Sequence, residues 1–190
     1  MEHELLPASR GAGPLLQRDY WAVFDDCTLK PSELIAYVKG HFCELPPGSL
    51  VQFRAPDVLD CDAELDIDIM PAQHCRVRVT HTDAQSLTLG TLAGHPEAGR
   101  ITFGAYRNAA GDVVFHIRSR ARSSSRMNLI GFFAIGDAMQ TNTWTDFIKN
   151  TAEAVGAKVR DAIVAETERV DESPDDDEPL AAPTFKAVGD

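Results

Sequence analysis

Strand-like runs follow one another between residues 49 and 121, with almost no helical period between them. They are SLVQF, AELDIDIM, QHCRVRVTH, QSLTLGTL, GRITFGAYR and DVVFHIRSRA. In QHCRVRVTH the apolar residues Cys75, Val77 and Val79 alternate with polar ones, which is the period of a half-buried strand. Such a succession predicts an antiparallel meander whose apolar face must be covered by another layer.

Two further elements are predicted before the meander. The segment RDYWAVF starts at Arg18 and has apolar residues on both sides of an extended chain, as in a strand covered on both faces. Tyr20, Ala22 and Phe24 lie on one side, and Trp21 and Val23 lie on the other. The segment KPSELIAYVKGHF follows, and Pro31 and Ser32 suit a helix start. Its apolar stripe consists of Leu34, Ile35, Val38 and Phe42.

The C-terminal third favours helix. MNLIGFFAIGDAMQ, residues 127–140, is very apolar and is compatible with a loose helix despite its two glycines. Residues 141–166 open with Thr143 and Asp146 at capping-box spacing, and they predict a helix of about six turns. The stripe of this helix is Trp144, Phe147, Ile148, Val155, Val159 and Ile163.

This order predicts an α+β fold in which a curved antiparallel sheet of about six to seven strands grips a long C-terminal helix. Gly90 and Gly104 lie inside strands, where glycine commonly marks a bend. We expect one helix-grip domain over residues 18–168, after a flexible leader at 1–17 and before an acidic disordered tail at 169–190. From Glu166 onward the sequence has nine acidic and two basic residues, a net charge of −7. The total net charge is −11, so the rest of the chain has a net charge of −4.

Composition excludes several classes of protein. No apolar run approaches eighteen residues, and the N-terminus lacks the pattern of a secretory signal, so we expect neither a membrane span nor secretion. The cysteines are Cys27, Cys43, Cys61 and Cys75, and their spacing fits no metal motif. We therefore expect free thiols in a cytoplasmic protein, with no metal and no cofactor.

One stretch resembles a known family. Residues 87–122 carry Gly94, His95, Glu97, Gly99 and Phe103, followed by a strand with three further matching positions, Phe115, Ile117 and Ser119. This pattern resembles the family called domain of unknown function nineteen-ninety, although Arg100 and Ile101 stand where that family usually has acids. The element order is similar to that of START-like and Bet v 1-like helix-grip proteins, and this similarity implies an apolar cavity between the sheet and the last helix.

The turn GHPEAG contains the candidate acid/base residues. Pro96 fixes its own φ and pushes His95 toward an extended conformation, so His95 and Glu97 can project from one rigid loop as general base and orienting carboxylate. The alternative is a structural turn in which His95 bonds the loop to the sheet. His116 alternates with Phe115 and Ile117, so it points away from a cavity that they line.

Arginines recur at period two along the last strand and then in a Ser-rich loop: Arg118, Arg120, Arg122 and Arg126. They form either a solvated face or a site for phosphate, such as a phosphopantetheine arm, and for an acyl carrier protein. Nucleic acid is not expected, because the domain is not basic and no aromatic run is interleaved with the arginines.

The sequence thus leads to two functional hypotheses. In the first, an apolar small molecule or lipid-like chain binds in a cavity lined by Phe103, Phe115, Ile117, Ser119, Met139, Trp144 and Phe147. Its enzymatic version is a cofactor-independent cyclase, dehydratase or isomerase acting on a polyketide-like chain. The second is a non-catalytic interaction or ligand-carrier module.

Overall fold

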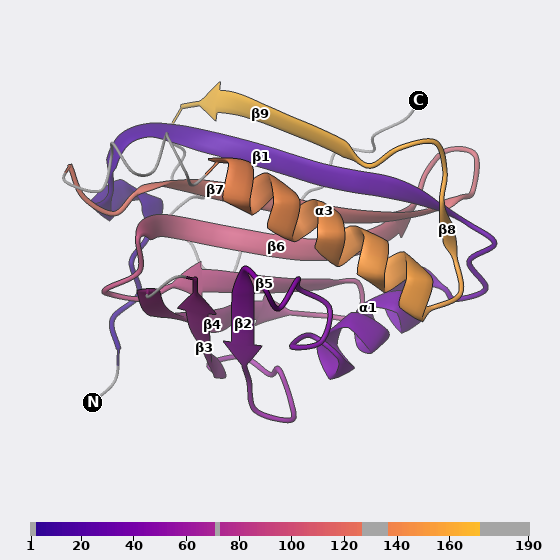
Figure 1. Cartoon of the computed structure of the whole chain (residues 1–190), viewed down its shortest axis with the longest axis horizontal. Coiled ribbons are helices and arrows are strands. Elements are labelled where there is room, and N and C mark those ends of the chain that lie inside the picture. Colours follow the sequence, from indigo (N-terminus) through magenta and orange to yellow (C-terminus); the bar gives the residue numbers. More distant parts are fainter. Residues whose placement is uncertain (1–2, 71–72, 127–136, 172–190) are drawn as a thin grey trace.

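The computed structural model describes residues 3–70, 73–126 and 137–171, with side chains from Gln140 onward in the last range. In Figure 1 the α-helices of the described residues lie on one face of a single sheet. The elements are η1 (Ala8–Arg10), β1 (Ala12–Asp25), α1 (Pro31–Gly40), β2 (Val51–Arg54), β3 (Glu64–Ile69), β4 (Gln73–Thr82), β5 (Ser86–Thr91), β6 (Glu97–Arg107), β7 (Val113–Ser123), α3 (Asp137–Ala154), β8 (Lys158–Val159) and β9 (Val164–Val170).

The sheet has nine strands, in the order β2-β3-β4-β5-β6-β7-β1-β8, with β9 also paired to β1. The strands β2 to β7 form the antiparallel meander that the alternating runs predict. The α+β prediction of a curved antiparallel sheet gripping a long helix is therefore confirmed. Two additional strands, β8 and β9, come from the C-terminal part of the chain, where helix was expected.

In the central strands every second residue points to the side of the sheet on which the helices lie. We call this side of the sheet the inner face and the opposite side the outer face. On β1 the inner residues are Tyr20, Ala22 and Phe24, which pair with Ile117, Phe115 and Val113 of β7. On α1 the buried side chains are Pro31, Leu34, Ile35 and Val38, and the last three pack into the same core. The predicted stripe of the first helix is thus confirmed.

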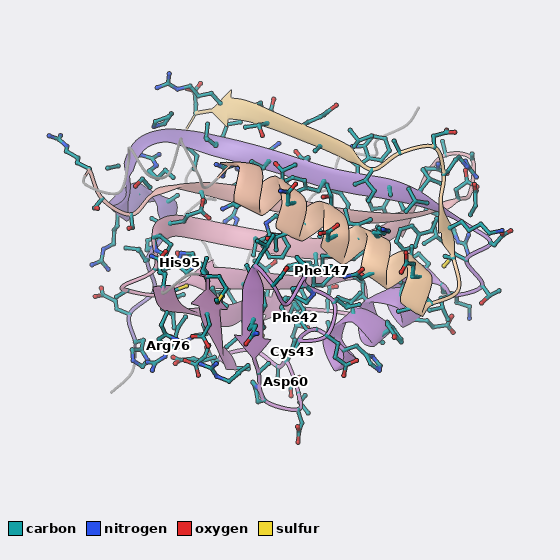
Figure 2. All side chains as sticks on the ribbon, viewed as in Figure 1. Phe42, Cys43, Asp60, Arg76, His95 and Phe147 are labelled. Atoms are coloured by element: carbon teal, nitrogen blue, oxygen red, sulfur yellow. The ribbon has the colours of Figure 1, made fainter. Side chains whose placement is uncertain are left out.

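Phe42, just after α1, joins the two helices to the sheet. Its ring centroid lies 5.3 Å from that of Phe53 on β2 and 5.1 Å from that of Phe103 on β6. It also lies 5.5 Å from the ring of Phe147 on α3. This aromatic group is the centre of the core, and Figure 2 shows Phe42 beside Phe147 beneath α3.

The prediction of a single helix over 141–166 is wrong in its second half. The helix α3 ends at Ala154, and Gly156 has a φ of +72°. The amide of Ala157 donates to the carbonyl of Ala152 at 2.9 Å, a bond that closes a helix C-terminus of the Schellman type. The chain then continues as β8 and β9, and Val159 and Ile163 still pack against the core.

The chain ends also differ from the expected boundaries. Within the expected leader, Leu6 bonds to the backbone of Thr91, Ala8 is buried, and β1 begins at Ala12. At the other end β9 runs to Val170, past the boundary at 168. Residues 172–190, most of the predicted acidic tail, lie outside the described residues, and so does the apolar segment 127–136.

Truncating Phe42 tests its central role in the core. We expect Phe42→Ala to lower the free energy of unfolding by about 3–5 kcal/mol, since it removes a ring packed between both helices and the sheet. The measurement is urea unfolding followed by circular dichroism. The control is Val58→Ala, at a residue 61% exposed, which should change stability by less than about 0.5 kcal/mol. Equal effects of the two substitutions would contradict this account of the core.

Candidate functional site

The turn before β6 holds His95 against its own backbone. Its Nδ1 lies 3.0 Å from both the backbone nitrogen and the carbonyl oxygen of Glu97. The amide of His95 donates to the carbonyl of Leu92 at 3.0 Å. Burial lowers the pKa of His95 to about 4, so the ring is neutral at pH 7. In Figure 2 His95 lies at one end of the sheet.

Glu97 is the first residue of β6, and its side chain has a different partner from the one expected. Its Oε1 lies 3.6 Å from a terminal guanidinium nitrogen of Arg18, whose side chain is only 1% exposed. The expected arrangement, a His95 ring oriented by the Glu97 carboxylate, differs from these contacts. His95 contacts the backbone of Glu97, while the carboxylate belongs to a buried ion pair.

Register places this ion pair toward the inner face. Arg18 has the same parity as Tyr20 and pairs with Ser119 of β7, which in turn pairs with Ile101 of β6. Glu97 has the same parity on β6 as Ile101. Its charge helps to raise the pKa of Cys75, a core residue of β4, although burial is the larger cause of the value of about 12. The carboxylate therefore acts on the side of the sheet that carries the core.

Besides Gln140 of α3, whose Oε1 is also buried without a partner, three polar side chains on the same side have no hydrogen-bond partner within the described part of the chain. They are the Ser119 hydroxyl, the Thr143 hydroxyl and the Trp144 indole N–H, all with buried polar atoms. Thr143 and Trp144 belong to the stripe of α3 that also contains Phe147. We call Arg18, Glu97, Ser119, Thr143 and Trp144 the inner polar cluster.

An aromatic wall adjoins the inner polar cluster. The ring of Phe103 lies 5.5 Å from that of Trp144 and 5.2 Å from that of Phe147. Phe115 lies 6.2 Å from Phe147, and Ile117 is fully buried beside them. Of the residues predicted to line a cavity, those on the sheet share the inner face with Ser119, and Trp144 and Phe147 pack on that face from α3. The side chain of Met139 lies outside the described residues.

Beside the inner polar cluster, the inner face is partly accessible to solvent. Ile101 points to the inner face, opposite the core residue Leu89, yet it is only half-buried. Gln140 and Trp144 of α3 are half-buried as well. Toward the other end, by contrast, Phe115 and Phe147 are inaccessible to solvent. Beside the inner polar cluster, the partial exposure of the inner face thus comes from Ile101 on the sheet and from Gln140 and Trp144 on α3.

The outer face carries a separate polar network. His116 is fully buried there, as its alternation with Phe115 predicts, and its Nε2 lies 2.6 Å from Asp19 Oδ1. The Nε of Arg118 donates to the same oxygen at 2.6 Å, and the hydroxyl of Tyr106 lies 3.2 Å from His116 Nδ1. Burial opposes the charge of Asp19, but the bonds from His116 and Arg118 lower its pKa overall.

The predicted arginine cluster is only partly solvated. Arg118 is bound to Asp19, Arg120 is half-buried, and Arg122 is buried beside η1. Arg126 is the exposed member. The four cysteines are free, as expected, and no group of three metal-binding side chains occurs within residues 3–70, 73–126 and 137–171.

Two members of the inner polar cluster were not expected. The sequence predicts only that a strand starts at Arg18, but its parity with Tyr20, Ala22 and Phe24 marks it as a charge on the core-facing side. The capping-box spacing predicts Thr143 as a helix cap, but α3 begins six residues earlier, at Asp137, and the Thr143 hydroxyl is buried without a partner among the described residues.

Residues 44–150 match the profile of a family described as a domain of unknown function (DUF1990). The chain belongs to this family. The match includes the GHPEAG turn, β6, β7 and most of α3, so the resemblance seen in residues 87–122 is confirmed. No curated protein matches the chain.

Solved structures share the fold at very low identity. The di-domain ARO/CYC StfQ from the steffimycin biosynthetic pathway is 9% identical, with a TM-score of 0.53, over 75% of this chain and 51% of that one. This member of the DUF1990 family thus spans about half of that di-domain protein. Norcoclaurine synthase from Thalictrum flavum, in complex with dopamine and hydroxybenzaldehyde, is 9% identical with a TM-score of 0.53, over 82% and 93% of the two chains.

Ginseng major latex-like protein 151 from Panax ginseng is 8% identical, with a TM-score of 0.50, over 75% of this chain and 98% of that one. These likenesses show that the DUF1990 chain has the helix-grip fold expected from its element order. Within the described residues, no helix of this chain is long and apolar enough to cross a membrane.

The low pKa of His95 predicts a pH dependence of stability. Between pH 6.5 and about 4 the unfolded chain binds a proton at this histidine and the folded chain does not, so stability falls as the pH drops through this window. The loss is about 3 kcal/mol, at 1.36 kcal/mol per pH unit. Urea unfolding at pH 7, 5.5 and 4.5 measures it.

His95→Asn is the matched variant, because its side-chain oxygen can accept from the amide of Glu97 but cannot be protonated in this range. We expect this variant to lose stability less steeply than the wild-type protein below pH 6.5. Parallel pH profiles for the two proteins would show that His95 is not buried as a neutral group.

Proposed function

We propose that this protein binds an apolar small molecule or lipid-like chain between the inner face of the sheet and α3. The observation that carries the proposal is the partial exposure of inner-face residues beside a buried aromatic wall. Ile101 and Trp144 are half-buried, whereas Phe103 and Phe147 are inaccessible to solvent. An apolar surface that ends in a few polar groups is the usual lining of a small-molecule site.

The structural neighbours support a ligand in this fold. Norcoclaurine synthase was solved with dopamine and hydroxybenzaldehyde, two small aromatic molecules. StfQ is named as an aromatase/cyclase of a biosynthetic pathway. These proteins share only the fold with the DUF1990 chain, so they support a binding role between sheet and helix more than any particular reaction.

In an enzymatic version of this function, the chain would promote cyclisation, dehydration or isomerisation without a cofactor. Of the two acid/base candidates, we favour Glu97, because its carboxylate is on the side of the core and pairs with Arg18. His95 would act through the backbone of Glu97 as a positioning residue. Binding would supply most of the catalysis by holding a reactive chain in a folded conformation.

An acyl carrier protein or another phosphate-bearing partner on the arginine face remains a second proposal. The geometry favours it less, because Asp19 binds Arg118 and because Arg122 is buried. A phosphate would have to compete with the Asp19 carboxylate for the guanidinium of Arg118.

Filling the half-buried part of the inner face tests the binding proposal. The probe is N-phenyl-1-naphthylamine, an apolar dye whose fluorescence rises on burial. We expect it to bind the wild-type protein, and Ile101→Trp to weaken binding by about tenfold or more, since the larger side chain occupies the space of the ligand. Fluorescence titration gives the dissociation constants.

The control is Val58→Trp, which adds the same side chain at an exposed position in the loop between β2 and β3. It should leave the dissociation constant unchanged. Binding that is absent from the wild-type protein, or that Ile101→Trp does not weaken in a variant with native circular dichroism, would overturn the proposal.

A further inference from the structure

We infer that the ligand carries a neutral oxygen group, a hydroxyl or a carbonyl, at the end that reaches the inner polar cluster. This inference rests on the proposed function and specifies the chemical class of its ligand. The oxygen would be bound by Ser119, Thr143 and Trp144, and the apolar body of the ligand would lie along Phe103.

The first support is that these three groups are buried without hydrogen bonds. Ser119 is 4% exposed and Thr143 is 2% exposed, and the polar atoms of both, like the indole N–H of Trp144, have no hydrogen-bond partner in the described part of the chain. Buried polar groups in proteins are nearly always satisfied, because leaving one without a partner costs stability. Three such groups on one side of the sheet therefore indicate a partner outside the described part of the chain, and we assign this role to the ligand.

The second support is their position relative to one another. In the pairing of β6 with β7, Phe103 is opposite Ile117, and Ile101 is opposite Ser119 in the next inner pair. Trp144 packs on Phe103 with the rings at 73° and 5.5 Å between centroids. Ser119 therefore lies one inner pair along the sheet from the residue that Trp144 covers, and Thr143 is adjacent to Trp144 on α3.

The third support concerns charge. Arg18 is the register partner of Ser119 and forms an ion pair with Glu97, so that a positive and a negative group face this part of the sheet together. Because Arg18 and Glu97 compensate each other, the pair has no net charge and offers neither an anionic nor a cationic ligand group an uncompensated partner. The remaining groups are two hydroxyls and one N–H; all three can donate a hydrogen bond to a ligand oxygen, and a hydroxyl can accept one from a ligand O–H. A neutral alcohol, phenol or ketone oxygen fits this set.

The experiment compares three probes with the same aromatic body and different substituents. These are 2-methylnaphthalene, 2-naphthol and 2-naphthoate, titrated at pH 7 by calorimetry. We expect 2-naphthol to bind the wild-type protein about tenfold more tightly than 2-methylnaphthalene, because its hydroxyl satisfies groups that the methyl leaves without partners. We expect 2-naphthoate to bind less tightly than 2-naphthol.

The double variant Ser119→Ala, Thr143→Val removes both hydroxyls with little change of volume. We expect it to bind the two neutral probes with affinities within about threefold of each other, through a loss of 2-naphthol binding alone. The control is Thr145→Val on the same helix, whose hydroxyl already bonds to the carbonyl of Thr141 at 2.8 Å. It should keep the wild-type preference.

The outcomes separate the two levels of the proposal. Three results would each overturn the neutral-oxygen inference but not the binding function. The wild-type protein could bind 2-naphthol and 2-methylnaphthalene with equal affinity, the double variant could keep the preference for 2-naphthol, or 2-naphthoate could bind most tightly of the three. If the wild-type protein binds none of the three probes or N-phenyl-1-naphthylamine, the binding function itself fails.

A stability measurement provides an independent check on the double variant. Loss of two hydroxyls that have no partners should leave the melting temperature of the ligand-free protein unchanged or raise it. A clear decrease in melting temperature would mean that the hydroxyls are satisfied within the protein, and this would also overturn the inference.

Discussion

The pairing of β1 with β7 is the constraint on which the rest of the structure depends. The first strand of the chain is added to the last strand of the meander, and its other edge takes β8 and β9. Its register decides which residues face the helices, because a slip of one position would move Tyr20, Ala22 and Phe24 from the core to the outer face. The same register also fixes Arg18 on the inner side.

Arg18 is therefore a charge that the fold must accommodate, and Glu97 provides the compensation. A buried ion pair is seldom more stable than an apolar pair of similar size, since both groups lose their hydration. This pair lies next to three polar groups that have no partner among the described residues, which fits the proposed binding role better than a role in stability. The inner face thus combines a sealed apolar part that stabilises the fold with a polar part that adds little to its stability.

Most of the sheet could be predicted because alternation is a local property. QHCRVRVTH and GRITFGAYR became β4 and β6 nearly to the residue. The end of α3 was harder to predict, because Val155, Val159 and Ile163 keep a helical spacing beyond it. Gly156 ends the helix, and Val159 and Ile163 reach the core from the segment that follows. At the site, the parity of Arg18 was visible in the sequence, but its pairing with Glu97 depends on strand neighbours that are far apart in the chain.

The GHPEAG turn links the fold of the sheet to the inner polar cluster. His95 is neutral and buried, and both of its contacts to Glu97 are to the backbone, so the ring fixes the path of the chain where β6 begins. Further along the turn, a side chain at Gly99 would meet the backbone oxygen of Arg120 at 2.2 Å, which requires glycine where β6 approaches β7. With the backbone held at both points, the carboxylate of Glu97 is directed to Arg18. The motif that looked like a catalytic pair thus works through a division of roles, in which the histidine positions the strand and the glutamate meets the inner face.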